Sequence, residues 1–118
     1  MQQQISDYFG SSAPWLEVLE TFCCLPYAAI IDEKIFCVHG GISPVLQSLE
    51  QINQIPRPLD AGDRQLTYDL LHTNPSNLYK GWTENDRGMD LSFGPDVVLN
   101  FLKYHDLTVI CRGHEVPY

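Results

Sequence analysis

Apolar positions in this 118-residue chain change from helical to strand-like spacing and back again. Between residues 11 and 24 they recur every three or four positions after a Ser-Ser-Ala-Pro start, a pattern that predicts a helix. Two short β-prone runs follow at 28–31 and 35–38. The polar stretch between these runs is only three residues long, which predicts a hairpin.

The rest of the chain continues this mixture. Ser43-Pro44 precedes apolar residues that share one helical face across 45–52, and this predicts a further helix. The other predicted elements are a loop at 53–63, a short helix at 67–71, a turn at Asn74-Pro75, a helix at 96–102 and a strand at 107–111. Because helices and strands are mixed and some strands are wholly apolar, the predicted fold class is α/β or α+β.

Charge and composition exclude several classes of function. Seven Lys and Arg against fifteen Asp and Glu give a net charge of −8, whereas nucleic-acid binding depends on basic side chains that neutralise phosphates. We therefore expect no nucleic-acid partner. The longest apolar stretch, 23–31, contains Pro26 and is too short to cross a bilayer, so we expect no membrane partner. The first residues lack the pattern of a signal peptide, and the expected location is the cytoplasm or the nucleus.

The four cysteines fit a reducing compartment. Cys23, Cys24, Cys37 and Cys111 all lie in apolar runs, where free thiols behave as small buried hydrophobes. Cys23 and Cys24 are consecutive, which disfavours an ordinary disulfide between them. The sequence therefore predicts four reduced and buried thiols.

Two β-prone runs stop at a histidine beside glycine. His39 directly follows the run 35–38 and precedes Gly40, and His114 follows Gly113 after the last predicted strand. An imidazole at a strand end can point into a cleft, and glycine lets the backbone or a ligand approach closely. The pair predicts two ligands that converge on one metal ion.

A turn-rich segment at 81–88 contains Arg87. The guanidinium is the side chain best shaped to bind a phosphate through two parallel hydrogen bonds. The alternative role of Arg87 is a surface ion pair with Glu84 or Asp86 in an ordinary exposed turn. Histidines for metal together with an arginine for phosphate indicate phosphoester chemistry.

A different metal site uses the cysteines. Cys37 and His39 are two residues apart, so on a strand both would face the same side. With Cys111 and His114 they would form a Cys2His2 tetrad, a small structural zinc module that needs no catalysis.

An ordered series of segments runs through most of the chain. It comprises 25–44, 49–52, Arg57-Pro58, 68–71, 81–88, 92–94, 101–102, 105–107 and 110–114. Over roughly residues 8–116, this series resembles the C-terminal part of the catalytic domain of the PPP-type serine/threonine protein phosphatases, nearest to the type-1 class.

The resemblance implies a partial calcineurin-like metallophosphatase fold, a β-sandwich with flanking helices that occupies residues 1–118 as one partial catalytic domain. The implied reaction is hydrolysis of phosphoserine and phosphothreonine in proteins by a water that bridges two divalent metal ions, manganese, iron or zinc. It implies that His39 and His114 bind the same metal ion and that Arg87 binds the substrate phosphate. It also implies that regulatory subunits bind a hydrophobic groove that includes Ile35 and Val109.

The resemblance also defines what we expect to be missing. The family's three earlier motifs, Gly-Asp-x-His-Gly, Gly-Asp-x-Val-Asp-Arg-Gly and Gly-Asn-His-Glu, do not occur here, and they supply the general acid and most metal ligands. The N-terminal half and the final strands of the domain are therefore expected to be absent, and the chain to be inactive alone. A non-catalytic fragment that binds phosphatase regulators is the alternative function.

The chain departs from the family pattern at three places inside the match. His72 begins a His-Thr-Asn-Pro segment where the family has Trp-Ser-Asp-Pro, Gly113 replaces a usual alanine, and Glu115 replaces a usual glutamine. His72 and His105 match no ligand position of the family and are interpreted as surface or structural residues.

Overall fold

The computed structural model describes residues 1–58, 64–84 and 90–115. The chain divides into two compact units. The first unit comprises Met1–Pro26 together with Pro56–Gly62, and the second comprises Tyr27–Ile55 together with Asp63–Tyr118.

The described part of the first unit has two helices, α1 (Gln2–Phe9) and α2 (Ala13–Cys23). Helix α2 confirms the sequence prediction and has proline in its first turn. Helix α1 was not predicted, although Gly10 marks its end with a φ of 67°, a left-handed conformation that favours glycine. Neither helix has a buried residue, so the expectation of buried thiols is wrong for Cys23 and Cys24, which are both exposed.

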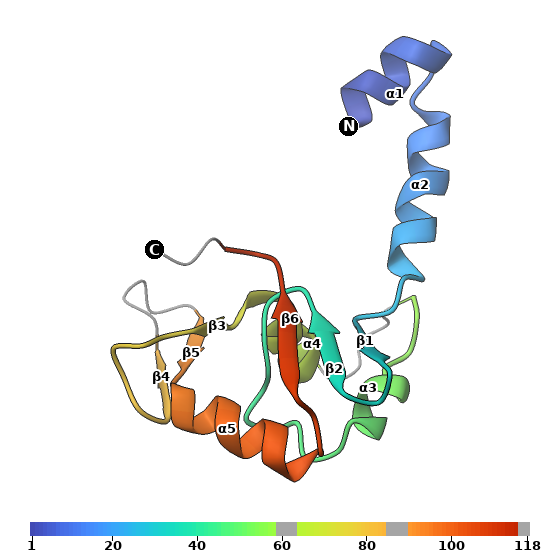
Figure 1. Cartoon of the computed structure of the whole chain (residues 1–118). Helices are drawn as coiled ribbons and strands as arrows, with labels where there is room; N and C mark the ends of the chain where they lie inside the picture. The colour runs from blue at the N-terminus through green and yellow to red at the C-terminus, as the bar shows by residue number, and fades with distance from the viewer. Residues whose placement is uncertain (59–63, 85–89, 116–118) are drawn as a thin grey trace. The chain divides into compact units, whose positions relative to one another are not determined.

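The described residues of the second unit form two three-stranded sheets (Figure 1). The first has the order β1-β2-β6, with β1 (Ala28–Ile31) antiparallel and β6 (Val109–Arg112) parallel to the central β2 (Ile35–Val38). The second has the order β3-β5-β4 and consists of β3 (Asn74–Pro75), β5 (Leu91–Phe93) and β4 (Trp82–Glu84). The helices of this unit are α3 (Glu50–Asn53), α4 (Arg64–His72) and α5 (Pro95–Tyr104). The mixed architecture confirms the predicted fold class.

The core of the second unit lies between the β1-β2-β6 sheet and its helices. Phe36 of β2 contacts Phe101 of α5 at a ring-centroid distance of 5.4 Å. Leu66 and Leu70 supply the apolar side of α4, which lies behind β2 and β6 in the view of Figure 1. Burial of these side chains fixes the sheet against both helices.

The predicted hairpin is confirmed, with Ile31 directly opposite Ile35 across β1 and β2. The predicted helix over 45–52 is wrong, because only Glu50–Asn53 is helical. The side chain of Gln51 accepts hydrogen bonds from the backbone N–H groups of Gln47 and Ser48 at 2.7 and 2.8 Å. A polar side chain here binds backbone donors locally and holds the segment before Glu50 in a non-helical path.

Two further predictions differ from the structure. The predicted turn at Asn74-Pro75 is a short strand that pairs in parallel with β5, consistent with the extended conformation that proline imposes on the preceding residue. The predicted buried state is also wrong for Cys111, which is exposed, and Cys37 is half-buried. All four cysteines are free, as predicted.

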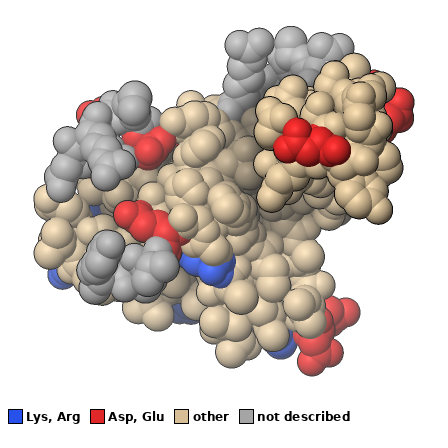
Figure 2. Space-filling model, turned by 90° about the horizontal axis from the view of Figure 1, so that it is seen from above, with Lys and Arg blue, Asp and Glu red and all other residues tan. Residues whose placement is uncertain are grey.

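No helix among the described residues is long and apolar enough to cross a membrane. In the view of Figure 2, the described Asp and Glu side chains lie at separate places, and the few visible Lys and Arg side chains form no continuous basic patch.

Candidate metal and phosphate site

The parallel pairing of β2 and β6 brings the two predicted metal ligands together. Cys37 and Cys111 are register partners, so the carboxyl ends of both strands meet at the same edge of the sheet. The chain then continues into His39 after β2 and into His114 after β6. The backbone N–H of Gly113 donates to the carbonyl oxygen of His39 at 3.2 Å, which joins the two strand ends directly.

The two imidazoles face one another at this edge. Nε2 of His39 lies 3.2 Å from Nδ1 of His114, with ring centroids 5.0 Å apart and an interplanar angle of 69°. Two nitrogens bound about 2.1 Å from one ion at octahedral or tetrahedral angles are themselves about 3.0 to 3.4 Å apart. The observed separation therefore fits two ligands of a single ion.

The backbone after His39 is held by close packing. The N–H of Gly40 donates to the carbonyl oxygen of Leu70 at 2.8 Å, at the end of α4. A Cβ at Gly40 would lie 2.6 Å from the backbone nitrogen of His72, and closer still to Leu71. Only glycine allows this approach, so the position of His39 depends on Gly40.

The backbone at His114 is less constrained. His114 is exposed and has a φ of 64°, and a Cβ at Gly113 would meet only Nδ1 of His39, at 3.9 Å. Partial loss of hydration lowers the pKa of His114 below its ordinary value, and the neighbouring side chains of His39, Arg112 and His72 lower it further. A lowered pKa keeps the imidazole neutral, which is the form that binds metal.

Arg112 supports the same edge and was not singled out in the sequence. Its Nε donates to the carbonyl oxygen of Gly40, and its Nη2 donates to Oδ1 of Asn74. Desolvation lowers the pKa of this half-buried guanidinium, and the nearby Glu115 opposes that shift. Arg112 thus joins β6, the residue after His39 and β3, a role that sequence spacing does not show.

A third histidine also lies beside the pair. The ring of His72, at the end of α4, has its centroid 5.8 Å from that of His114 and 4.3 Å from that of Tyr68. The hydroxyl of Tyr68 donates to Oδ1 of Asp90 at 2.6 Å, and this hydrogen bond raises the pKa of Tyr68. The only sequence signal for His72 was its replacement of a tryptophan in the family pattern.

The predicted Cys2His2 zinc module is not formed. Within residues 1–58, 64–84 and 90–115, no group of three or more His, Cys, Asp or Glu side chains could hold a metal ion. The reason is that Cys37 and Cys111 lie within the strands, whereas His39 and His114 follow them at the sheet edge. Arg87, the predicted phosphate ligand, lies outside the described residues.

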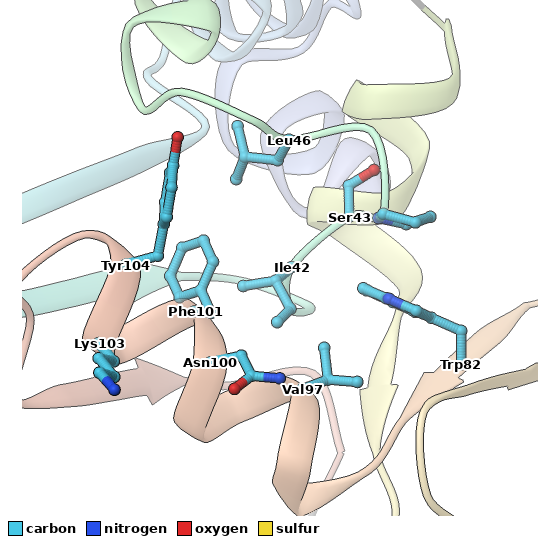
Figure 3. A pocket seen from close by; sticks show the side chains of 10 residues that line it. Ile42, Ser43, Leu46, Trp82, Val97, Asn100, Phe101, Lys103 and Tyr104 are labelled. Atoms are coloured by element: carbon cyan, nitrogen blue, oxygen red, sulfur yellow. The ribbon is translucent and has the colours of Figure 1, made fainter.

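Figure 3 shows a large hollow in the second unit. It has a volume of about 860 Å³ and lies between α5 and the segment that follows His39. Its lining includes Ile42, Leu46, Trp82 and Phe101, all largely apolar side chains. Among the described residues that line it are neither His39 nor His114.

Comparison with known proteins shows the family of the chain. The model of the calcineurin-like phosphoesterases matches residues 1–118. The chain belongs to the calcineurin-like phosphoesterase family. A solved structure, described as a protein serine/threonine phosphatase from Saccharomyces cerevisiae with similarity to human phosphatase PP5, matches with a TM-score of 0.72 and 28% identity. The match covers 83% of this chain and 30% of that yeast chain, so this chain spans less than a third of that relative.

Membership in the calcineurin-like phosphoesterases confirms the predicted metallophosphatase fold. The family generally binds divalent metal ions. The residues present fit part of such a site, because His39 and His114 offer two nitrogens at the separation that one ion requires.

Proposed function

We propose that this chain supplies part of the active site of a metal-dependent protein phosphatase that hydrolyses phosphoserine and phosphothreonine. The observation that carries the proposal is the 3.2 Å approach of His39 Nε2 to His114 Nδ1 at the joined ends of β2 and β6. Both imidazoles would hold one divalent ion, manganese, iron or zinc. Two such ions, when bound, would lower the pKa of a bound water and polarise the phosphoryl group.

Arg87 has a separate role in this proposal. Its guanidinium would bind the substrate phosphate and stabilise the charge that develops in the transition state.

The chain does not provide a complete reaction site in this proposal. Two imidazoles and one arginine can neither hold two metal ions nor protonate the leaving alkoxide. We therefore propose that these 118 residues do not hydrolyse phosphoproteins by themselves. The nearest class is proposed to be type 1, on the ordered motifs described for the sequence.

Metal binding by the full chain tests the histidine pair. Titration with Mn²⁺, followed by electron paramagnetic resonance, should show a site that weakens at least about tenfold in His39→Ala and in His114→Ala. His105→Gln is the matched control. His105 directly follows α5, packs on Phe101 and Tyr104, and is not one of the two proposed metal ligands. Equal Mn²⁺ affinity in all four proteins would contradict the proposal.

The role of Arg87 is tested in an intact PPP-type phosphatase that carries this segment in place of its own. Arg87→Ala should lower kcat/KM on a phosphopeptide about 10²- to 10³-fold, because a preorganised cation is removed. Arg57→Ala in the same hybrid is the control, since Arg57 donates to the carbonyl oxygen of Cys24 in the first unit. Unchanged turnover in Arg87→Ala would leave Arg87 as a surface turn residue.

We also propose that regulatory subunits bind the outer face of the β1-β2-β6 sheet through apolar side chains. Ile35 and Val109, the two predicted groove residues, are direct register partners on this face, and Val109 is 44% exposed. An apolar peptide from such a subunit should bind Val109→Asp more weakly than the wild-type chain. It should bind Leu99→Asp as tightly as the wild-type chain, because Leu99 lies on the exposed side of α5. It stays a prediction that the substrates are phosphoproteins and that the protein is located in the cytoplasm or the nucleus.

A further inference from the structure

The outer face of the β1-β2-β6 sheet brings two cysteines together. Cys37 of β2 and Cys111 of β6 are direct register partners in parallel strands. Partners in neighbouring strands project to the same face, so both thiols lie beside the apolar pair Ile35 and Val109. Burial raises the pKa of the Cys37 thiol, and the neighbouring Cys111 raises it further.

This placement satisfies the main geometric demand of a disulfide. Neighbouring strands are about 4.8 Å apart, and disulfide-bonded cysteines have Cα atoms about 4.4 to 6.8 Å apart. Both cysteines are free in the structure. Cys111 is exposed and Cys37 is half-buried, so an oxidant in solution can reach one thiol while the other lies next to it.

We propose that Cys37 and Cys111 form a dithiol site that hydrogen peroxide converts into an intramolecular disulfide. The Cys111 thiolate attacks one peroxide oxygen, the O–O bond breaks, and a sulfenic acid and hydroxide form. The sulfur of Cys37 then attacks the sulfenic sulfur, the S–O bond breaks, and the S–S bond forms as hydroxide leaves. The protons of the two thiols convert both hydroxides to water, so the dithiol loses two electrons and peroxide gains them.

The site goes beyond the proposed phosphatase function, because it needs neither a metal ion nor a phosphate ligand. It also differs from the other cysteine pair of the chain. Cys23 and Cys24 are consecutive and lie at the end of α2. Their Cα atoms are about 3.8 Å apart across one peptide bond, shorter than the usual disulfide range, so they provide an internal comparison.

The test uses the full chain with Cys23→Ser/Cys24→Ser, which leaves Cys37 and Cys111 as its two cysteines. The reduced protein is held in a chelator, treated with increasing hydrogen peroxide, alkylated and digested for mass spectrometry. We expect both thiols to be lost together, with a linked peptide that contains Cys37 and Cys111 and that dithiothreitol separates. In Cys37→Ser, Cys111 should instead accumulate as a sulfenic acid that dimedone traps.

A register control keeps two thiols on the same face. Cys37→Ser/Ile35→Cys moves one thiol two residues along β2, so that it lies opposite Val109 and diagonal to Cys111. The diagonal Cα separation is about 8 Å, beyond the reach of a disulfide. We expect no linked peptide from this variant. The proposal would be overturned if Cys37 stayed reduced and could still be alkylated at peroxide levels that oxidise Cys111. An equal amount of linked peptide from the register control would also overturn it.

Discussion

The two strand ends that carry the histidines are built differently. After β2, Gly40 is packed against the backbone of α4 so closely that a Cβ does not fit. After β6, a Cβ at Gly113 would make only an ordinary contact with Nδ1 of His39, and the exposed His114 has a left-handed backbone. One imidazole is therefore positioned by the packed fold, whereas the other is positioned mainly by short hydrogen-bonded connections.

This difference indicates how the site meets a metal ion. A ligand on packed backbone keeps its geometry without the ion, while a ligand on open backbone can adjust to it at little energetic cost. Arg112 connects the two ends, since it belongs to β6 and donates to the carbonyl oxygen of Gly40. The comparison predicts that substitutions after β2 change stability and that substitutions after β6 change it far less.

Gly40→Ala should have the largest effect. The added methyl group would meet the backbone of Leu71 and His72, which cannot move without displacing the end of α4. Overpacking against backbone costs about 3 kcal/mol or more of the free energy of unfolding. Urea denaturation followed by circular dichroism measures it. A loss below about 1 kcal/mol would show that the β2 end is as adaptable as the β6 end.

Arg112→Met should have the next largest effect. It keeps an unbranched apolar side chain but removes the donors to the carbonyl oxygen of Gly40 and to Oδ1 of Asn74. Loss of these half-buried hydrogen bonds should lower the free energy of unfolding by about 1 to 2 kcal/mol. Arg112→Lys should restore only part of it, because an ammonium cannot reproduce the planar fork. Full rescue by lysine would contradict the bridging role of the guanidinium.

Much of this architecture could be predicted from the sequence, and the reasons are local. The hairpin 28–38 and the helices near 13–23 and 95–104 follow from apolar spacing and turn residues. The convergence of His39 and His114 followed from the family resemblance and from glycine beside each strand end. Their direct approach requires the parallel register of β2 and β6, which connects residues more than 70 positions apart.

The missed features depend on contacts that spacing does not encode. The side chain of Gln51 accepts the N–H groups of Gln47 and Ser48 in the 45–52 segment, and no periodicity reveals these contacts. His72 joins the histidine pair only because α4 ends against Gly40. Cys111 lies in an apolar run yet is exposed, because strand alternation turns it to the outer face of a three-stranded sheet.

Asp96→Asn tests the support behind the β2 end at a smaller scale. Gly41, two residues after His39, packs on Phe93 of β5. Three residues after Phe93, the two carboxylate oxygens of Asp96 accept the N–H of Gly81 at 2.9 and 3.1 Å, and this contact fixes the chain that follows β5. This hydrogen bond is the main cause of the lowered pKa of Asp96 in the folded protein.

A lowered folded pKa means that the carboxylate stabilises the fold fully above its ordinary value of 3.8. That contribution is lost as the pH falls through the lowered pKa. The Tm of Asp96→Asn should therefore lie below wild type at pH 7, and the two values should converge in acid. A Tm difference that is the same at pH 7 and in strong acid would contradict this assignment.

Gly113→Ala should have the smallest effect and completes the comparison with Gly40→Ala. The new methyl group would lie 3.9 Å from Nδ1 of His39, an ordinary van der Waals distance, and Gly113 does not have a positive φ. Alanine also lowers the conformational entropy of the unfolded chain, so the free energy of unfolding should stay within about 0.5 kcal/mol of wild type or rise slightly. The same urea denaturation measures both glycine variants. A loss at Gly113 as large as that at Gly40 would show that the β6 end is packed as tightly as the β2 end, and that His114 is no more adjustable than His39.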